Sequence, residues 1–309
     1  MSEARAAINP PQAVVQAGLF DEAFLRKLER IAILSKRAMA GQLQGERRSP
    51  KRGQSVEFAD FRPYSVGDDF RRIDWNAYAR LERFFIKLFV EEEDLTVHLL
   101  LDASLSMDWG QPNKFTYAIR SAGALGYIAL HGLDRLTITA LGETHNSNDG
   151  YFSPHRGKQN AFALFSFLQE LVPAGQARLG SALQAYAARA PRPGPLLLLS
   201  DLMDDSWAVG LTALAARGFD VSVVHILSPD EISPDLTGDL KLLDSETKVE
   251  VEITGEYDLI ERYRKGLADW QEELRRFCAA RAMQYAPIET SIPIEELLFA
   301  RLRKHGILR

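Results

Sequence analysis

Two short and almost continuously apolar runs, each ending in an aspartate, constrain the fold of this 309-residue chain more than any other feature. They lie at residues 95–102 and 195–201. Runs of this kind are typical of strands that are buried on both faces. Strand and helix patterns alternate around them, so we predict an α/β fold, with a mostly parallel sheet and helices on both faces.

The same periodicities predict the other elements. The expected helices of the central region are 114–131, 160–171, 179–190 and 208–217, and the expected strands are 135–141, 151–156 at an edge, and 220–227. After residue 230 we expect a hairpin (241–244 with 248–254), a helix (257–282), a strand (284–288) and a last helix (293–305). An amphipathic helix is expected at 21–39, followed by a basic loop at 41–53.

These elements divide the chain into four segments. Residues 1–45 form a tail and the amphipathic helix, and residues 46–94 precede the sheet. Residues 95–230 form the α/β domain, and residues 231–309 add a hairpin and helices that we expect to pack on the same core.

The amino-acid composition limits the binding partners and the cellular compartment that we expect for this chain. The apolar share of 46% supports a large core, and the net charge of -5 gives no general reason to expect nucleic-acid binding or membrane binding. The basic stretch 26–52 is the local exception, to be explained as a solvated helix face with a loop or as a contact with an acidic partner. A single cysteine, Cys278, indicates a reducing compartment, and no apolar run reaches the roughly 18 residues that span a bilayer. With no secretion signal at its start, the chain is expected to be cytoplasmic, without direct membrane insertion.

The candidate site follows from the ends of the two apolar runs. In an open parallel sheet, ligands bind beyond the carboxyl ends of the strands, where the strand order reverses. Asp102 and Asp201 close the two runs, and Ser104 and Ser106 follow the first. Two carboxylates and two hydroxyls form a hard-oxygen set that suits Mg²⁺ or Mn²⁺. The alternative is that Asp102 and Ser104 only cap the following helix.

The Asp-x-Ser-x-Ser pattern at 102–106, with a later strand ending in Ser-Asp, resembles the metal-ion-dependent adhesion site of von Willebrand A domains. The resemblance implies a von Willebrand A-like (Rossmann-type) fold and a metal site at Asp102, Ser104, Ser106 and Asp201. That family supplies a threonine ligand where this chain has Ala177, and Arg178 replaces an acidic residue. Both departures weaken the case for a tightly held ion.

A second resemblance concerns the segment before the sheet. Glu57-Phe58, Arg62-Pro63-Tyr64, Gly67-Asp68-Asp69 and Arg71-Arg72-Ile73-Asp74-Trp75 resemble the family catalogued as domain of unknown function 58. We expect Asp68, Asp69 and Asp74 to pair with Arg71, Arg72 and Arg80, and Trp75 to serve as an apolar anchor. This segment is then a strap that holds the extension to the core, or alternatively a partner-binding surface.

The second family implies a function. Its members resemble adaptors encoded beside MoxR-type AAA+ ATPases, so we expect a non-enzymatic interaction module that works with such an ATPase on an unidentified target. In this hypothesis the edge around Asp102 engages an acidic side chain of the partner, directly or through Mg²⁺. A Mg²⁺- or Mn²⁺-dependent hydrolase or nuclease using the same carboxylates is the alternative. No nucleic-acid partner is expected, and a nucleic-acid contact through residues 26–52 would show steep salt dependence.

Other catalytic signatures do not occur in the sequence. No serine-hydrolase elbow, zinc-protease motif, dinucleotide fingerprint or phosphate-binding loop is present. The histidines never fall at metal-ligand spacing, and His98 and His225 are expected to be core residues.

Overall fold

The computed structural model describes residues 19–34, 56–65, 68, 70, 73–91, 95–142, 150–176, 178–234, 238–243, 250–255 and 257–309. The chain divides into two compact units. One comprises Met1–Met39 with Leu95–Arg309, and the other is Ala40–Asp94. They are described separately.

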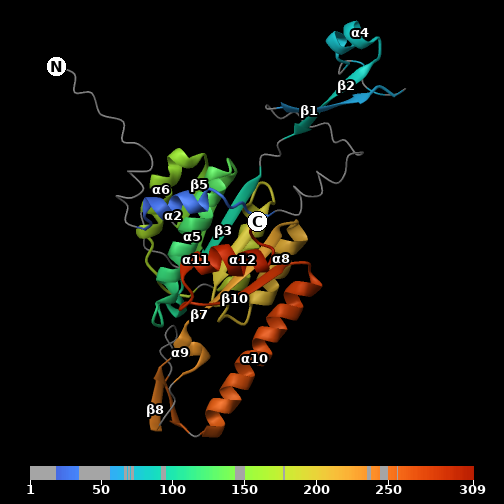
Figure 1. Ribbon diagram of the computed structural model, residues 1–309. Coiled ribbons are helices and arrows are strands. Elements are labelled where there is room, and N and C mark those ends of the chain that lie inside the picture. The colour runs from blue at the N-terminus through green and yellow to red at the C-terminus, as the bar shows by residue number, and fades with distance from the viewer. Residues whose placement is uncertain are drawn as a thin grey trace, which may run out of the picture. The chain divides into compact units, whose positions relative to one another are not determined.

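The larger unit contains a six-stranded sheet (Figure 1). Its strands are β3 (Thr96–Asp102), β4 (Arg135–Leu141), β5 (Tyr151–Arg156), β6 (Pro195–Ser200), β7 (Asp220–Leu227) and β10 (Gln284–Glu289). The order across the sheet is β10-β7-β6-β3-β4-β5, and every neighbouring pair is parallel except β4 with the edge strand β5. Counted along the chain, this is the doubly wound order 3-2-1-4-5-6, which confirms the predicted α/β class. The strand order reverses between β3 and β6.

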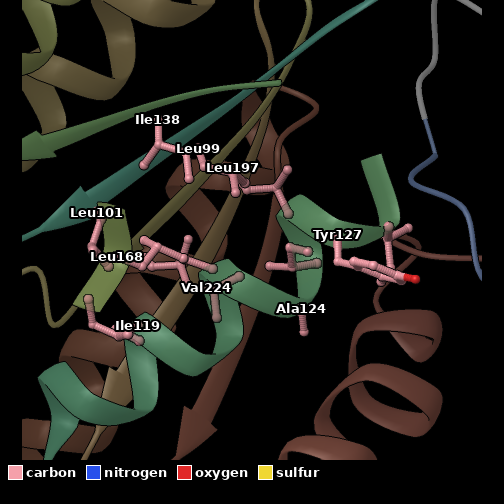
Figure 2. Close-up of a cluster of buried hydrophobic side chains, with 14 of the residues drawn as sticks. Leu99, Leu101, Ile119, Ala124, Tyr127, Ile138, Leu168, Leu197 and Val224 are labelled. Atoms are coloured by element: carbon pink, nitrogen blue, oxygen red, sulfur yellow. The ribbon is translucent and has the colours of Figure 1, made fainter. Parts of the chain in front are cut away.

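Helices cover both faces of this sheet because successive strand residues point to opposite sides. In β3, Leu99 and Leu101 enter one core and Leu100 enters the other. The first core packs against α2 (Glu22–Leu28), α5 (Lys114–His131), α6 (Ala161–Gln169) and the C-terminal helices. Figure 2 shows part of it, with strand residues such as Leu197 beside residues of α5. The second core packs against α7 (Leu179–Arg189), α8 (Trp207–Arg217) and α10 (Tyr257–Ala280).

The first helix is shorter than its periodicity predicts. Asp21 caps it by accepting a hydrogen bond from the Phe24 amide, and α2 ends at Leu28. Beyond it, Ile33 forms an antiparallel bridge with Leu308, and Ala32 exchanges backbone hydrogen bonds with Arg309. The predicted helix is therefore wrong for residues 29–34: Glu29 and Arg30 form a turn, and residues 32–34 satisfy backbone groups by pairing with the C-terminal segment. Residues 35–39 of the predicted helix lie outside the described residues.

The C-terminal part completes the sheet. After α9 (Pro229–Ile232), a hairpin of β8 (Gly238–Leu243) and β9 (Glu250–Gly255) precedes α10, and β10 then pairs with β7. The predicted last helix is interrupted: α11 (Ile294–Glu296) and α12 (Leu302–Lys304) flank a π-helical turn, η4 (Leu297–Arg301). No helix in the described part of the chain is both long and apolar enough to cross a membrane.

The smaller unit is built on an antiparallel pair, β1 (Val56–Pro63) with β2 (Phe85–Glu91), and on the helix α4 (Trp75–Leu81). Asp74 caps α4 by accepting hydrogen bonds from the amides of Asn76 (2.9 Å) and Ala77 (3.2 Å). The Phe84 ring stacks on Tyr78 at 4.4 Å between ring centres and meets Trp75 edge-on at 6.3 Å. An aromatic cluster therefore joins α4 to the start of β2.

Candidate site at the carboxyl edge of the sheet

The turn after β3 brings three predicted site residues together. One carboxylate oxygen of Asp102 accepts hydrogen bonds from the amide and the hydroxyl of Ser104, at 3.0 and 2.7 Å. The hydroxyls of Ser104 and Ser106 lie 2.9 Å apart. The other Asp102 oxygen accepts a 2.5 Å hydrogen bond from the hydroxyl of Ser200, the last residue of β6. Asp102 and Ser104 are both 1% exposed, so this network links β3 to β6 inside the protein.

Asp201, the fourth predicted residue, is paired with a lysine that the sequence did not single out. Its Oδ2 accepts a 2.7 Å hydrogen bond from the Lys114 ammonium, and its Oδ1 accepts one from the Met203 amide. The same ammonium donates to Glu231 of α9 at 2.5 Å. Lys114 and Asp201 have side chains only 1% exposed, whereas the Glu231 side chain is 14% exposed. We call Lys114, Asp201 and Glu231 the buried triad.

Charge and burial act in opposite directions at this edge. Burial, followed by the nearby charge of Asp201, raises the pKa of Asp102 to about 7, although hydrogen bonds from Ser200 and Ser104 counteract this rise. Burial alone would lower the pKa of Lys114, but the charges of Asp201 and Glu231 outweigh it and raise that pKa above its ordinary value. Lys114 is therefore a charged ammonium at neutral pH.

The expected Mg²⁺ or Mn²⁺ does not fit this arrangement. All four carboxylate oxygens of Asp102 and Asp201 already accept hydrogen bonds from protein groups. An ammonium beside Asp201 repels a divalent cation, and in a dry interior that repulsion is strong. Within the described ranges, no group of three or more His, Cys, Asp or Glu side chains is arranged to hold a metal ion. Ala177, which replaces the expected threonine, lies outside the described residues.

The site residues predicted for the segment before the sheet belong to the smaller unit. Asp68 accepts a 2.6 Å hydrogen bond from the Arg62 guanidinium and a 2.9 Å bond from the Ser65 amide, so it closes the turn that follows β1. Asp74 is the cap of α4, and Trp75 belongs to the aromatic cluster. Asp69, Arg71 and Arg72 lie outside the described residues. That this segment is a strap, or alternatively a partner-binding surface, stays a prediction.

Sequence reasoning missed three residues of the site. Lys114 was recognised only as the start of a helix, and Ser200 and Glu231 received no role. The sequence carried no signal for Lys114, because a lysine in the first turn of a helix is ordinarily solvated and is almost never fully buried unless it is paired. Its partners are 87 and 117 residues further along the chain, so no local pattern identifies them.

The two strand histidines are core residues, as predicted. His98 Nδ1 lies 2.6 Å from the Tyr186 hydroxyl, and His225 Nδ1 lies 2.7 Å from the Tyr285 hydroxyl. His225 also contacts the backbone carbonyl of Asp201 through Nε2, at 3.0 Å. Burial lowers the pKa of both histidines from 6.5 to about 4.

This burial predicts acid sensitivity. Between pH 6.5 and 4 the unfolded chain binds protons at His98 that the folded chain does not bind, so stability falls as the pH falls through this window. Full protonation of the unfolded state costs on the order of 3 kcal/mol for this histidine. The variant His98→Gln, which cannot titrate there, is expected to lose less stability than the wild type between pH 7 and pH 4.5 in urea unfolding. Asp102, whose pKa is raised, changes the stability in the opposite direction as the pH falls. This change is the same in the wild type and in His98→Gln, so it cancels when the two proteins are compared. Identical pH profiles would contradict this prediction.

The fold and this edge define a class: a doubly wound α/β protein with a network of buried, paired polar groups where the strand order reverses. Within that class, the chain belongs to the family described as protein of unknown function DUF58, whose model matches residues 60–273. Similar proteins include Uncharacterized protein Rv1480 of Mycobacterium tuberculosis and Uncharacterized protein Mb1516 of Mycobacterium bovis. Each is 25% identical over 282 residues, which is 89% of this chain and 87% of the relative.

Solved structures show more distant likeness. The conserved hypothetical protein BatB from Bacteroides thetaiotaomicron gives a TM-score of 0.37 at 16% identity, covering 63% of this chain and 90% of BatB. An aerotolerance-related membrane protein from Bacteroides fragilis gives 0.36 at 17% identity, covering 55% of this chain and 87% of that protein.

Proposed function

We propose that this chain is a non-enzymatic protein-interaction module whose partner-binding face is the carboxyl edge of the central sheet. One observation carries the proposal: the ionisable side chains of Asp102, Asp201 and Lys114 are buried and hydrogen-bonded to protein groups. By contrast, Trp109 and Met203, in the loops that follow β3 and β6, are 56% and 47% exposed. Exposed aromatic and methionine side chains are enriched in protein interfaces. A fully engaged polar network offers no general base or nucleophile to a substrate.

A pocket beside this edge supports the same function. It has a volume of about 420 Å³ and lies between residues 202–205 and α10, with Met203, Tyr263 and Trp270 in its lining. Its carboxylates come from Asp204 and Asp205. This lining suits an apolar side chain of a partner that carries basic neighbours, better than the acidic side chain expected from the sequence.

The proposed partner is a MoxR-type AAA+ ATPase, acting with this chain on an unidentified target. This part of the proposal is supported by the resemblance to adaptors encoded beside such ATPases. The von Willebrand A-like character of the domain is supported by the doubly wound sheet and by the Asp102–Ser106 turn. We do not propose the hydrolase or nuclease, because neither carboxylate is exposed and no observation favours turnover.

The test measures binding of the full chain to the MoxR-type ATPase of the same organism, with Mg²⁺ and ATP. Trp109→Ala and Met203→Ala are each expected to weaken the affinity about tenfold or more, because truncating a central interface residue costs about 2 kcal/mol or more and about 1.4 kcal/mol corresponds to tenfold. Phe162→Ala and Leu133→Ala are the matched controls, since these side chains are 49% and 55% exposed and belong to the first turn of α6 and the turn before β4, not to the loops after β3 and β6. Absence of binding by the intact chain, or equal weakening by the controls, would refute the proposal.

A further inference from the structure

The buried triad shares Asp201 with the residues at which the resemblance placed a metal ion. Lys114 is the first residue of α5, and its side chain reaches the end of β6 and the start of α9. Its ammonium thereby touches carboxylates from two elements that follow neighbouring parallel strands, β6 and β7.

We propose that the Lys114 ammonium is the resident cation of this edge, and that it replaces the divalent metal and makes the site independent of Mg²⁺ and Mn²⁺. This inference goes beyond the proposed function, because it concerns how the edge is held together and not what binds to it. It rests on the contacts of the triad, on its burial and on the charge balance at the edge.

Charge balance is the first argument. Asp201 and Glu231 place two carboxylates on one ammonium at 2.7 and 2.5 Å, so Lys114 is enclosed by negative charge. A lysine has three N–H donors and acts as a compact point charge, which suits two carboxylates from different directions. A divalent cation at Asp201 would have to compete with this ammonium for the same carboxylates.

The second argument is that the Asp102 carboxylate is also engaged, because it already accepts three hydrogen bonds from protein groups. Ser104 donates to Asp102 and lies within hydrogen-bond distance of Ser106, and Ser200 donates to the second oxygen of Asp102. Mg²⁺ binds oxygens at about 2.0–2.1 Å in near-octahedral geometry and dehydrates reluctantly. Direct coordination of the ion by Asp102 would therefore compete with these hydrogen bonds.

The third argument is that Glu231 is fixed independently of Lys114. The second oxygen of its carboxylate accepts a 2.8 Å hydrogen bond from the Ser228 amide, and the Ser228 hydroxyl accepts from the Glu231 amide, which forms a capping box. The Tyr263 hydroxyl of α10 also donates to the Glu231 carbonyl at 2.6 Å. The position of Glu231 is therefore built into the fold around the ammonium.

The test compares thermal unfolding of the full chain in EDTA, in millimolar Mg²⁺ and in millimolar Mn²⁺, at matched ionic strength. A ligand that binds only the native state stabilises it, so the wild type is expected to change its Tm by less than about 1 °C. Lys114→Ser leaves the carboxylates without their cation and opens space for an ion. Its Tm is expected to be lower than that of the wild type in EDTA, and to rise by about 5 °C with either divalent ion. Lys27→Ser, which removes an exposed partner of Glu295, is the matched control and is expected to gain no response.

A wild-type Tm that rises with Mg²⁺ or Mn²⁺ and falls with EDTA would overturn the proposal, as would a folded Lys114→Ser variant without any divalent response. Mn²⁺ titration of the wild type by electron paramagnetic resonance decides the question even if Lys114→Ser does not fold. One equivalent of bound Mn²⁺ that Asp102→Asn abolishes would overturn the proposal. No binding, or binding that Asp102→Asn leaves unchanged, supports it.

Discussion

Replacing Lys114 by methionine is expected to lower the free energy of unfolding by about 3–5 kcal/mol, because removing one partner of a buried ion pair leaves uncompensated buried charge. The Lys114 side chain is 1% exposed and is the cation in contact with both Asp201 and Glu231. Methionine keeps most of the apolar length of the side chain, so the loss reports the charge and its hydrogen bonds more than the packing. Urea unfolding of the full chain measures the difference.

The matched control is Lys27→Met. Lys27 forms an ion pair of similar length, 2.6 Å, with Glu295, but both side chains are more than half exposed. Exposed pairs contribute about 0–1 kcal/mol, so this variant is expected to unfold almost like the wild type. Adding Glu231→Gln to Lys114→Met removes one of the unpaired charges and is expected to restore part of the lost stability. A loss below about 1 kcal/mol for Lys114→Met would contradict the prediction, since it would show that the triad contributes no more than an exposed pair.

The variant Gly110→Ala is expected to lower the free energy of unfolding by about 2–4 kcal/mol, through overpacking and backbone strain together. A Cβ atom on residue 110 would lie 2.2 Å from the Cβ of Ser228 and 2.7 Å from its hydroxyl. The residue also has φ +86°, a conformation that disfavours a side chain. Because Gly110 follows Trp109 and packs against the cap of α9, we also expect the variant to weaken partner binding.

Gly266→Ala is the matched control for this substitution. Residue 266 lies inside α10, and a Cβ atom there would meet nothing within 4 Å. Replacing an interior helical glycine by alanine is expected to stabilise the protein by about 0.5–1 kcal/mol. Equal unfolding midpoints for the two variants would contradict the role given to Gly110, because the two glycines would then be equally replaceable.

Site residues that are close together in the sequence could be predicted as a group, whereas partners far apart in the sequence could not. Asp102, Ser104 and Ser106 lie within one turn, and hydrogen bonds join their side chains, whereas the metal site predicted from their pattern stays a prediction. Asp201 was placed at the same edge because it ends the second buried run. Its actual partner was not foreseen, because a lysine in the first turn of a helix is ordinarily solvated.

The ends of the chain show the same limit for helices. The stripe of apolar residues at 21–34 has helical spacing, yet the helix stops at Leu28 because Ala32 and Ile33 pair with the backbone of the C-terminal residues. Local periodicity reports which residues are buried, and it does not report which backbone groups find a distant partner.

What the sequence determined by itself is the alternation of strands and helices in the central region. The strands β4, β5 and β7 and the helix α5 have the predicted bounds, because their apolar patterns are set by residues close together in the chain. Only the tertiary structure decided the electrostatic character of the site. The strand order brings the ends of β3, β6 and β7 to one edge, and Lys114, Asp201 and Glu231 meet there across 87 and 117 residues of chain. The physical reason is that a buried charge is stable only beside its counter-charges, and the folded chain supplies these from separate strands and helices.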